Sequence, residues 1–203
     1  MHGSSARSHV VQLDTTVPVW EQFFTVAPLV LVGTRDEDGS LDLAPKHMVT
    51  PMGWQNFFGF VCTPRHKTCS NIERNGEFTV SYPKPSEVLT ASLAASPRVG
   101  KGQKPIIDFF HTFPATLVDG RFIKDGYLYF ECRHHKTVDG FGENCLVTGE
   151  IVAAYADEKY LRSSEADDAE IIHEAPLFAY LAPGRFATID HSNAFPFPES
   201  MKK

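Results

Sequence analysis

Short apolar runs separated by turn signals follow one another along most of the chain. Residues 28–34, PLVLVGT, form a continuous β-branched and leucine run, which predicts a strand buried on both faces. The next run starts at Leu41 and alternates apolar with polar positions, and the Asp38-Gly39 step before it is typical of a hairpin turn. Pro45 interrupts this second strand because proline has no N–H to donate. We therefore expect a sheet edge or a bulge at Pro45, where a ligand can reach the backbone.

The pattern continues with further short strands and few helices. Residues 54–62 are rich in aromatic side chains and predict a third strand, and residues 68–74 predict a short amphipathic helix that Asn75-Gly76 ends. A second short helix is expected within residues 85–96, with Ser86 as its N-cap. Further strands are expected at residues 77–82, 115–118, 120–124, 127–135, 146–155 and 185–189. Many short strands with few helices between them indicate a mainly β protein built as an antiparallel barrel.

Length and composition narrow the protein class. A chain of 203 residues is expected to form a single domain, residues 1–203, with a small and polar start, residues 1–9, that is disordered. The net charge of -6 argues against a nucleic-acid partner. No stretch approaches the ~18 apolar residues of a membrane span, so no membrane partner is expected. The 4 cysteines form no C-x-x-C pair, which predicts reduced thiols and a cytoplasmic location.

A basic loop stands out against this acidic background. Residues 63–68, TPRHKT, place Arg65, His66, Lys67 and Thr68 at the start of the predicted helix. Free backbone N–H groups and the positive end of the helix dipole favour an anion at such a place. Arginine binds phosphate through two hydrogen bonds, lysine adds a point charge and threonine adds a hydroxyl donor. The loop is therefore a candidate phosphate site, and the alternative is an ordinary solvated loop.

Other kinds of site are not supported by the spacing of reactive residues. His134 and His135 are adjacent on a predicted strand, so they point to opposite faces and cannot bind one metal ion together. No nucleophile elbow and no G-x-G-x-x-G motif is present. We expect no metal site, and the catalytic residues remain unassigned.

Four stretches, taken together, resemble the flavin reductase-like proteins that bind FMN in a split β-barrel. The second is the most specific, because it joins the basic loop, a Thr-x-x-Asn-Ile helix start and a Gly-Glu-Phe strand. The four stretches span most of residues 28–155. They are PLVLVGTRDEDGSLDLAP, RHKTCSNIERNGEFTV, the irregular loop after the second helix, and GENCLVTGEIVAAY.

The resemblance implies a fold, a cofactor and a set of binding residues. The fold would be a mainly β, antiparallel split β-barrel of Greek-key type with a few short helices. FMN would bind noncovalently near the interface of a homodimer and would receive electrons from NADH or NADPH. By position, the isoalloxazine would be lined by Ala44, Pro45, Lys46, His47 and Met48, and the phosphate end by Arg65, His66, Lys67 and Thr68. Neighbours on a strand face opposite ways, so only one of Lys46 and His47 is expected to meet the ring.

The chain also departs from the family pattern. Gly142-Glu143-Asn144 stands where the family often has Gly-Asp-His, and that histidine is associated with the nicotinamide side in some members. Two function classes therefore stay open. The first is an NAD(P)H-dependent FMN oxidoreductase that passes electrons to free flavin, oxygen or another small-molecule acceptor. The second is an FMN-binding protein or electron carrier without turnover. A third hypothesis keeps the barrel but changes the ligand to pyridoxine phosphate or to haem, with His47 or His66 on the iron.

Overall fold

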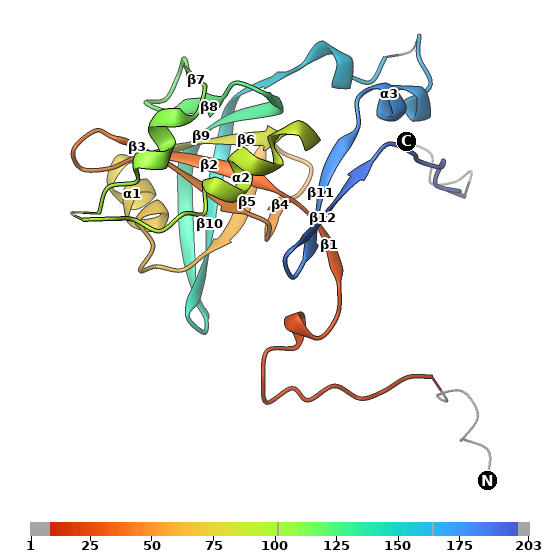
Figure 1. The fold of residues 1–203 in the computed structure, drawn as a ribbon, viewed down its shortest axis with the longest axis horizontal. Coiled ribbons are helices and arrows are strands. Elements are labelled where there is room, and N and C mark those ends of the chain that lie inside the picture. The colour runs from red at the N-terminus through yellow and green to blue at the C-terminus, as the bar shows by residue number, and fades with distance from the viewer. Residues whose placement is uncertain (1–8, 101, 164, 199–203) are drawn as a thin grey trace.

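A curled, seven-stranded antiparallel sheet forms the body of the protein (Figure 1). The structure, a computed structural model, describes residues 9–100, 102–163 and 165–198. We expected residues 1–9 to be disordered, and residues 1–8 of this segment lie outside the described ranges. The strands of this sheet, in the order β3-β2-β6-β9-β10-β5-β4, are β2 (Val30–Arg35), β3 (Leu41–Lys46), β4 (Val49–Pro51), β5 (Phe57–Cys62), β6 (Glu77–Pro83), β9 (Gly126–Phe141) and β10 (Asn144–Ala156). The predicted mainly β, antiparallel barrel architecture is confirmed.

Two smaller sheets and a few short helices complete the fold. Figure 1 shows the three-stranded sheet β1-β11-β12 and helix α3 to one side of the half-barrel. The remaining strands are β1 (Thr25–Pro28), β7 (Thr112–Pro114), β8 (Arg121–Ile123), β11 (Leu177–Ala182) and β12 (Arg185–Ile189). The helices are α1 (Lys67–Asn75), α2 (Val88–Leu93) and α3 (Asp168–Glu174), with 3-10 turns η1 (Val19–Glu21), η2 (Pro85–Glu87), η3 (Pro105–Phe109) and η4 (Glu158–Tyr160). None of the helices in the described ranges has the length and apolar character needed to cross a membrane.

Strand β2 separates two hydrophobic clusters and belongs to both. Val30 and Val32 pack into the cluster inside the half-barrel, which α1 closes with Ile72. Leu31 points the other way, into a cluster that α2 closes with Ala91. Val30, Leu31 and Val32 are all fully buried. The prediction of a strand buried on both faces is confirmed, and burying both faces fixes the β2–β3 register.

The elements that later matter for the site agree closely with the sequence pattern. Helix α1 begins at Lys67, one residue before the predicted start, and its C-cap Gly76 has the left-handed φ of 73°. The Gly76 N–H donates to the Ile72 carbonyl at 2.8 Å, which ends the helix where Asn75-Gly76 predicted. Strand β3 lies at one edge of the seven-stranded sheet, as expected from Pro45.

Residues 115–118 are a loop and not the predicted strand, which is a correction. The amides of Thr116 and Val118 donate to the carboxylate of Glu131 at 2.9 and 3.0 Å, so they pair with a side chain in place of a neighbouring strand. Strands β7 and β8 flank this loop and pair with each other, with Pro114 opposite Arg121.

Two further boundaries also differ from the sequence prediction. Strand β5 begins at Phe57 and not at residue 54, because the Met52 N–H donates to the Phe57 carbonyl and closes a turn over the residues between them. Ser86 is not an N-cap, since it lies inside the turn η2 and makes no capping hydrogen bond to α2.

Candidate functional site

A pocket of about 440 Å³ forms where the end of β3, the start of α1 and the segment after α2 meet. Strand β3 contributes residues 44–46, and the basic loop with the first turn of α1 contributes residues 65–68. Residues 94–98, which follow α2, form the third wall. The two stretches that the sequence singled out are thus brought together across a gap of about 20 residues in the chain. Antiparallel pairing of β5 with β4 and β10 holds the loop at this place.

Two of the predicted site residues do not line this pocket. The ring of His47 lies 4.8 Å from the ring of Tyr180 in β11, outside the pocket lining. Met48 is 48% exposed, and its carbonyl accepts a hydrogen bond from the Val61 amide. The alternation of β3 places Lys46 on the pocket side, so His47 faces the other way. Burial and the nearby Lys46 lower the pKa of His47, which therefore stays neutral at pH 7.

The start of α1 has hydrogen-bond donors available to a ligand. The Cys69 amide donates to the His66 carbonyl at 3.0 Å, but the amides of Lys67 and Thr68 donate to no described residue. Thr68 is only 2% exposed as a residue, and its hydroxyl takes part in no hydrogen bond within the described part of the chain. Because no fully buried side-chain polar atom there lacks a partner, this hydroxyl oxygen must be partly accessible. Because Thr68 also lines the pocket, two amides and one hydroxyl are available there to an anionic group.

His66 is the N-cap residue of α1, and its side chain makes no capping hydrogen bond. Burial, Lys46 and Arg65 hold the pKa of its imidazole below the ordinary value. A neutral imidazole at pH 7 leaves the positive charge of the pocket to the lysines and arginines.

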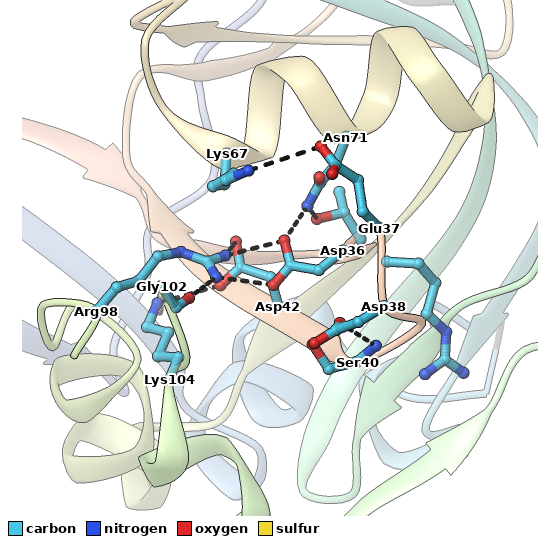
Figure 2. A network of polar contacts seen from close by, with 12 residues as sticks. Asp36, Glu37, Asp38, Ser40, Asp42, Lys67, Asn71, Arg98, Gly102 and Lys104 are labelled. Atoms are coloured by element: carbon cyan, nitrogen blue, oxygen red, sulfur yellow. Dashed lines mark hydrogen bonds and ion pairs between the residues drawn. The ribbon is translucent and has the colours of Figure 1, made fainter. Parts of the chain in front are cut away.

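Most of the cations in the pocket lining are paired with carboxylates. Arg65 contacts Glu143 at 3.0 Å, and Lys67 lies 3.9 Å from Glu37 (Figure 2 shows the second pair). Both pairs are at the surface, where an ion pair contributes little and can exchange for a ligand. Lys46, which also lines the pocket, forms no ion pair with any described residue. It is therefore the cation whose charge is least compensated by the protein.

Three charged residues of the lining, Asp42, Arg98 and Lys104, were not predicted from the sequence. Arg98 contacts Asp36 at 2.7 Å and Asp42 at 3.1 Å, and the Lys104 ammonium lies 3.4 Å from Asp42. Asp42 is 3% exposed, and a buried carboxylate in a strand requires a charged or hydrogen-bonding partner. That requirement was the available signal, although the pattern did not indicate which cation would meet it.

Within the described ranges, no group of three or more His, Cys, Asp or Glu side chains is arranged to hold a metal ion. The imidazole of His134 contacts the Thr137 hydroxyl at 3.0 Å, while His135 packs against the ring of Phe57. The adjacent histidines thus have different neighbours.

Comparison with known proteins identifies the family of this chain. A family model described as "Flavin reductase like domain" matches residues 24–178, which include the whole pocket lining. A flavoredoxin from Methanosarcina acetivorans has a similar structure, with a TM-score of 0.76 and 22% identity over 96% of this chain and 98% of that chain.

Two further solved structures have the same fold. A flavin reductase with a split barrel domain from Shewanella frigidimarina has a TM-score of 0.73 and 19% identity over 85% of this chain and 87% of that one. An FMN-binding protein from Thermus thermophilus has a TM-score of 0.72 and 15% identity over 92% of this chain and 99% of that one. The half-barrel described above is therefore a split barrel.

Proposed function

The chain belongs to the flavin reductase-like family, and on this basis we propose that it binds FMN noncovalently in the pocket and acts as an NAD(P)H-dependent oxidoreductase. The observation that carries this proposal is the meeting of residues 44–46 of β3 with the open start of α1 in a single cavity of about 440 Å³. Cavities of roughly 300–1,000 Å³ are typical of cofactor sites. The similarity to a Thermus thermophilus protein named as FMN-binding supports FMN as the flavin.

The phosphate end of the ligand belongs at the start of α1. The amides of Lys67 and Thr68 and the Thr68 hydroxyl would donate to phosphate oxygens, and the Lys67 ammonium would add charge. Arg65 can join them by leaving Glu143, because that ion pair is exposed and therefore weak. Each charge-assisted hydrogen bond contributes about 1.5–3 kcal/mol, so this end favours FMN over riboflavin.

The ring end belongs along β3. Ala44 is small and 9% exposed, and Pro45 offers no N–H to a neighbouring strand, so this edge of the sheet can be covered by a flat ring. When bound, the flavin would supply the electron-transfer chemistry, and the protein would orient it and set its electrostatic surroundings. Lys46 is the residue best placed to set these electrostatic surroundings, since no described carboxylate compensates its charge.

Flavin binding without turnover is the second candidate function, and one observation favours it. Glu143 lies at the tip of the β9–β10 hairpin and reaches Arg65 at the edge of the pocket. A carboxylate at that place would repel the diphosphate of an approaching nicotinamide dinucleotide. In that case the flavin would exchange electrons with a different donor.

We also propose a homodimer. A mainly apolar groove of about 660 Å³ lies at the opposite end of β5 from the pocket, lined by residues that include Phe57, Phe130 and Ile151. The neighbouring Trp54 is 90% exposed and Met52 is 37% exposed, and apolar surface of this kind favours association. Sedimentation equilibrium that returns the mass of a single chain at micromolar concentration would contradict the dimer.

The buried, free state of all 4 cysteines supports a reducing, cytoplasmic location.

An absorption spectrum with added FMN, repeated anaerobically after NADH and then NADPH, tests the function. We expect flavin bands shifted by binding that bleach with one of the two nucleotides. Bands that shift but persist with both nucleotides would support the carrier function. A protein that does not change the FMN spectrum would contradict the flavin site.

Replacing Lys46 with alanine is expected to lower the reduction potential of bound FMN. The lysine charge stabilises the anionic reduced flavin, and about 1–2 kcal/mol of lost stabilisation corresponds to about 20–40 mV for a two-electron couple. Lys46→Arg, which keeps the charge, is the control and is expected to leave the potential nearly unchanged. A spectroelectrochemical titration measures it, and equal potentials for wild type and Lys46→Ala would place the side chain away from the ring.

A further inference from the structure

The segment that lines the pocket after α2 has little apolar packing of its own. We name residues 94–98 the roof segment; it follows α2 directly and lines the pocket throughout. At its start, Ala94 is fully buried in the second hydrophobic cluster. Residues 95 and 97 are exposed, and the next buried apolar side chain in the described part of the chain is Ile107. The far end of the roof segment therefore depends on polar contacts for its position.

Arg98 supplies those contacts at the end of the roof segment. Its guanidinium donates to both carboxylate oxygens of Asp36, at 2.7 and 3.3 Å, and lies 3.1 Å from Asp42. It also donates to the Gly102 carbonyl at 2.6 Å, which closes the following turn. Figure 2 shows the guanidinium reaching from the roof side toward the two aspartates. A planar fork with several donors suits such simultaneous contacts, and a lysine could not make all of them.

The same network continues into α1, the helix whose start forms the phosphate end of the pocket. The Asn71 side-chain amide donates to Asp36 at 2.8 Å and to the Thr34 hydroxyl at 3.1 Å (Figure 2). Asn71 is fully buried. Asp36 thus accepts hydrogen bonds from the roof segment and from α1 at once. The two walls of the pocket are joined through one carboxylate that belongs to the turn between β2 and β3.

The charges in this network balance one another. Arg98 and Lys104 face Asp36 and Asp42, whose side chains are only 14% and 4% exposed. The Lys104 ammonium also donates to the Leu43 carbonyl at 2.8 Å. Because its charge is already compensated, Arg98 contributes little net attraction for an anion in the pocket. Its contribution to a ligand is therefore expected to come through the position of the roof segment.

We propose that Arg98 is a positioning residue that holds the roof segment over the isoalloxazine and ribityl part of the bound flavin, through Asp36 and Asp42. This inference rests on the proposed function for the identity of the ligand. Without the guanidinium, the roof segment samples open positions, and the apparent dissociation constant rises by the inverse of the closed fraction. A closed fraction that falls to about one tenth weakens binding about tenfold. The ligand phosphate lies at α1, so FMN and riboflavin weaken by the same factor.

Fluorescence titrations of FMN and of riboflavin against the full chain test the proposal. For Arg98→Ala we expect dissociation constants at least about tenfold higher for both flavins, with the ratio between the two flavins unchanged. Arg98→Lys, which can pair with only one of the aspartates, is expected to recover part of the loss. Lys67→Ala is the comparison at the phosphate end, and it is expected to weaken FMN but not riboflavin.

A matched control is an ion pair of similar length elsewhere in the fold. Arg162 contacts Asp168 in α3 at 2.7 Å, well exposed and outside the pocket lining. Arg162→Ala is expected to bind both flavins as the wild type does. Unchanged binding of both flavins by Arg98→Ala would overturn the proposal. A loss for FMN alone would also overturn it, because it would place Arg98 on the phosphate.

Hydrogen–deuterium exchange of the flavin-free protein separates this proposal from the proposed function. We expect faster exchange in residues 94–100 of Arg98→Ala than in Arg162→Ala, with the strands of the half-barrel unchanged. A wild type that binds neither flavin would reject the proposed function, while this local change would still establish the anchoring role of Arg98. Exchange that is the same in both variants, or faster throughout the molecule, would overturn it.

Discussion

Replacing Glu131 with glutamine is expected to lower the free energy of unfolding by about 3 kcal/mol, a large effect for one exchanged atom. The carboxylate is fully buried and accepts from the amides of Thr116, Leu117 and Val118. The Tyr155 hydroxyl donates to it as well, at 2.8 Å. Glutamine keeps one oxygen but turns an NH₂ group toward donors, which leaves buried amides without an acceptor. Chemical denaturation at neutral pH measures the loss.

The same prediction has a pH dependence. Burial raises the pKa of Glu131, but the hydrogen bonds from Thr116, Leu117 and Tyr155 outweigh it and hold the pKa below its ordinary value of 4.5. A carboxyl with a lowered folded-state pKa contributes stability above the unfolded-state pKa and loses it as pH falls through the folded-state pKa. The difference in the free energy of unfolding between wild type and Glu131→Gln is therefore expected to be largest at neutral pH and to shrink below about pH 4.5.

Glu150→Gln is the matched control for this experiment, since Glu150 lies on the neighbouring strand β10 and is exposed. We expect its unfolding free energy to stay within about 0.5 kcal/mol of the wild type. If Glu131→Gln unfolds at the same denaturant concentration as Glu150→Gln, the carboxylate does not hold the 116–118 loop.

Replacing Thr68 with valine is expected to weaken FMN binding by about 1.5–3 kcal/mol, roughly 10–160-fold, and to leave the flavin-free protein as stable as the wild type. Valine has almost the same shape, and no hydrogen bond of the described residues involves the Thr68 hydroxyl, so folding loses no internal hydrogen bond. A bound phosphate, in contrast, loses a donor in a nearly buried place. Titration with FMN and chemical denaturation without it measure the two effects.

Thr148→Val provides the opposite pattern. Thr148 is 3% exposed, and its hydroxyl donates to the Lys136 carbonyl at 2.9 Å, away from the pocket lining. This variant is expected to lose about 1 kcal/mol of stability and to bind FMN normally. If Thr68→Val binds FMN as tightly as wild type, the phosphate does not lie at the start of α1.

Family membership gives the fold and a flavin-related oxidoreductase character, and the pocket is the location that we propose for the flavin. Asn144 stands where the family often has a histidine, and Glu143 beside it pairs with Arg65 at the edge of the pocket, so the proposed approach of the electron donor is examined apart from the flavin site. The nucleotide experiment therefore separates turnover from binding, and the Thr68 and Arg98 variants examine the two ends of the cradle independently.

Local sequence signals determined the parts of the fold that depend on neighbouring residues. The apolar run of β2 indicated burial on both faces, because a strand covered on both sides needs apolar residues at successive positions. Asn75-Gly76 located the end of α1, since glycine adopts the left-handed conformation without strain. Pro45 indicated a sheet edge for the same kind of local reason. The basic loop before α1 was found because its charges are consecutive in the chain.

Only the tertiary structure decided which distant residues meet. Arg98 lies 62 positions from Asp36, and nothing in the pattern around either residue specifies the other. Similarly, the side chains of residues 116–118 are typical of a strand, but the backbone amides of this segment donate to the carboxylate of Glu131 in β9. Alternation left open which of Lys46 and His47 faces the pocket, and the tertiary structure decided it: Lys46 lines the pocket, and His47 packs against Tyr180 in β11. Periodicity and turn chemistry are written in short windows of sequence, whereas the partner of a buried charge is set by how the sheet and its loops fold together in space.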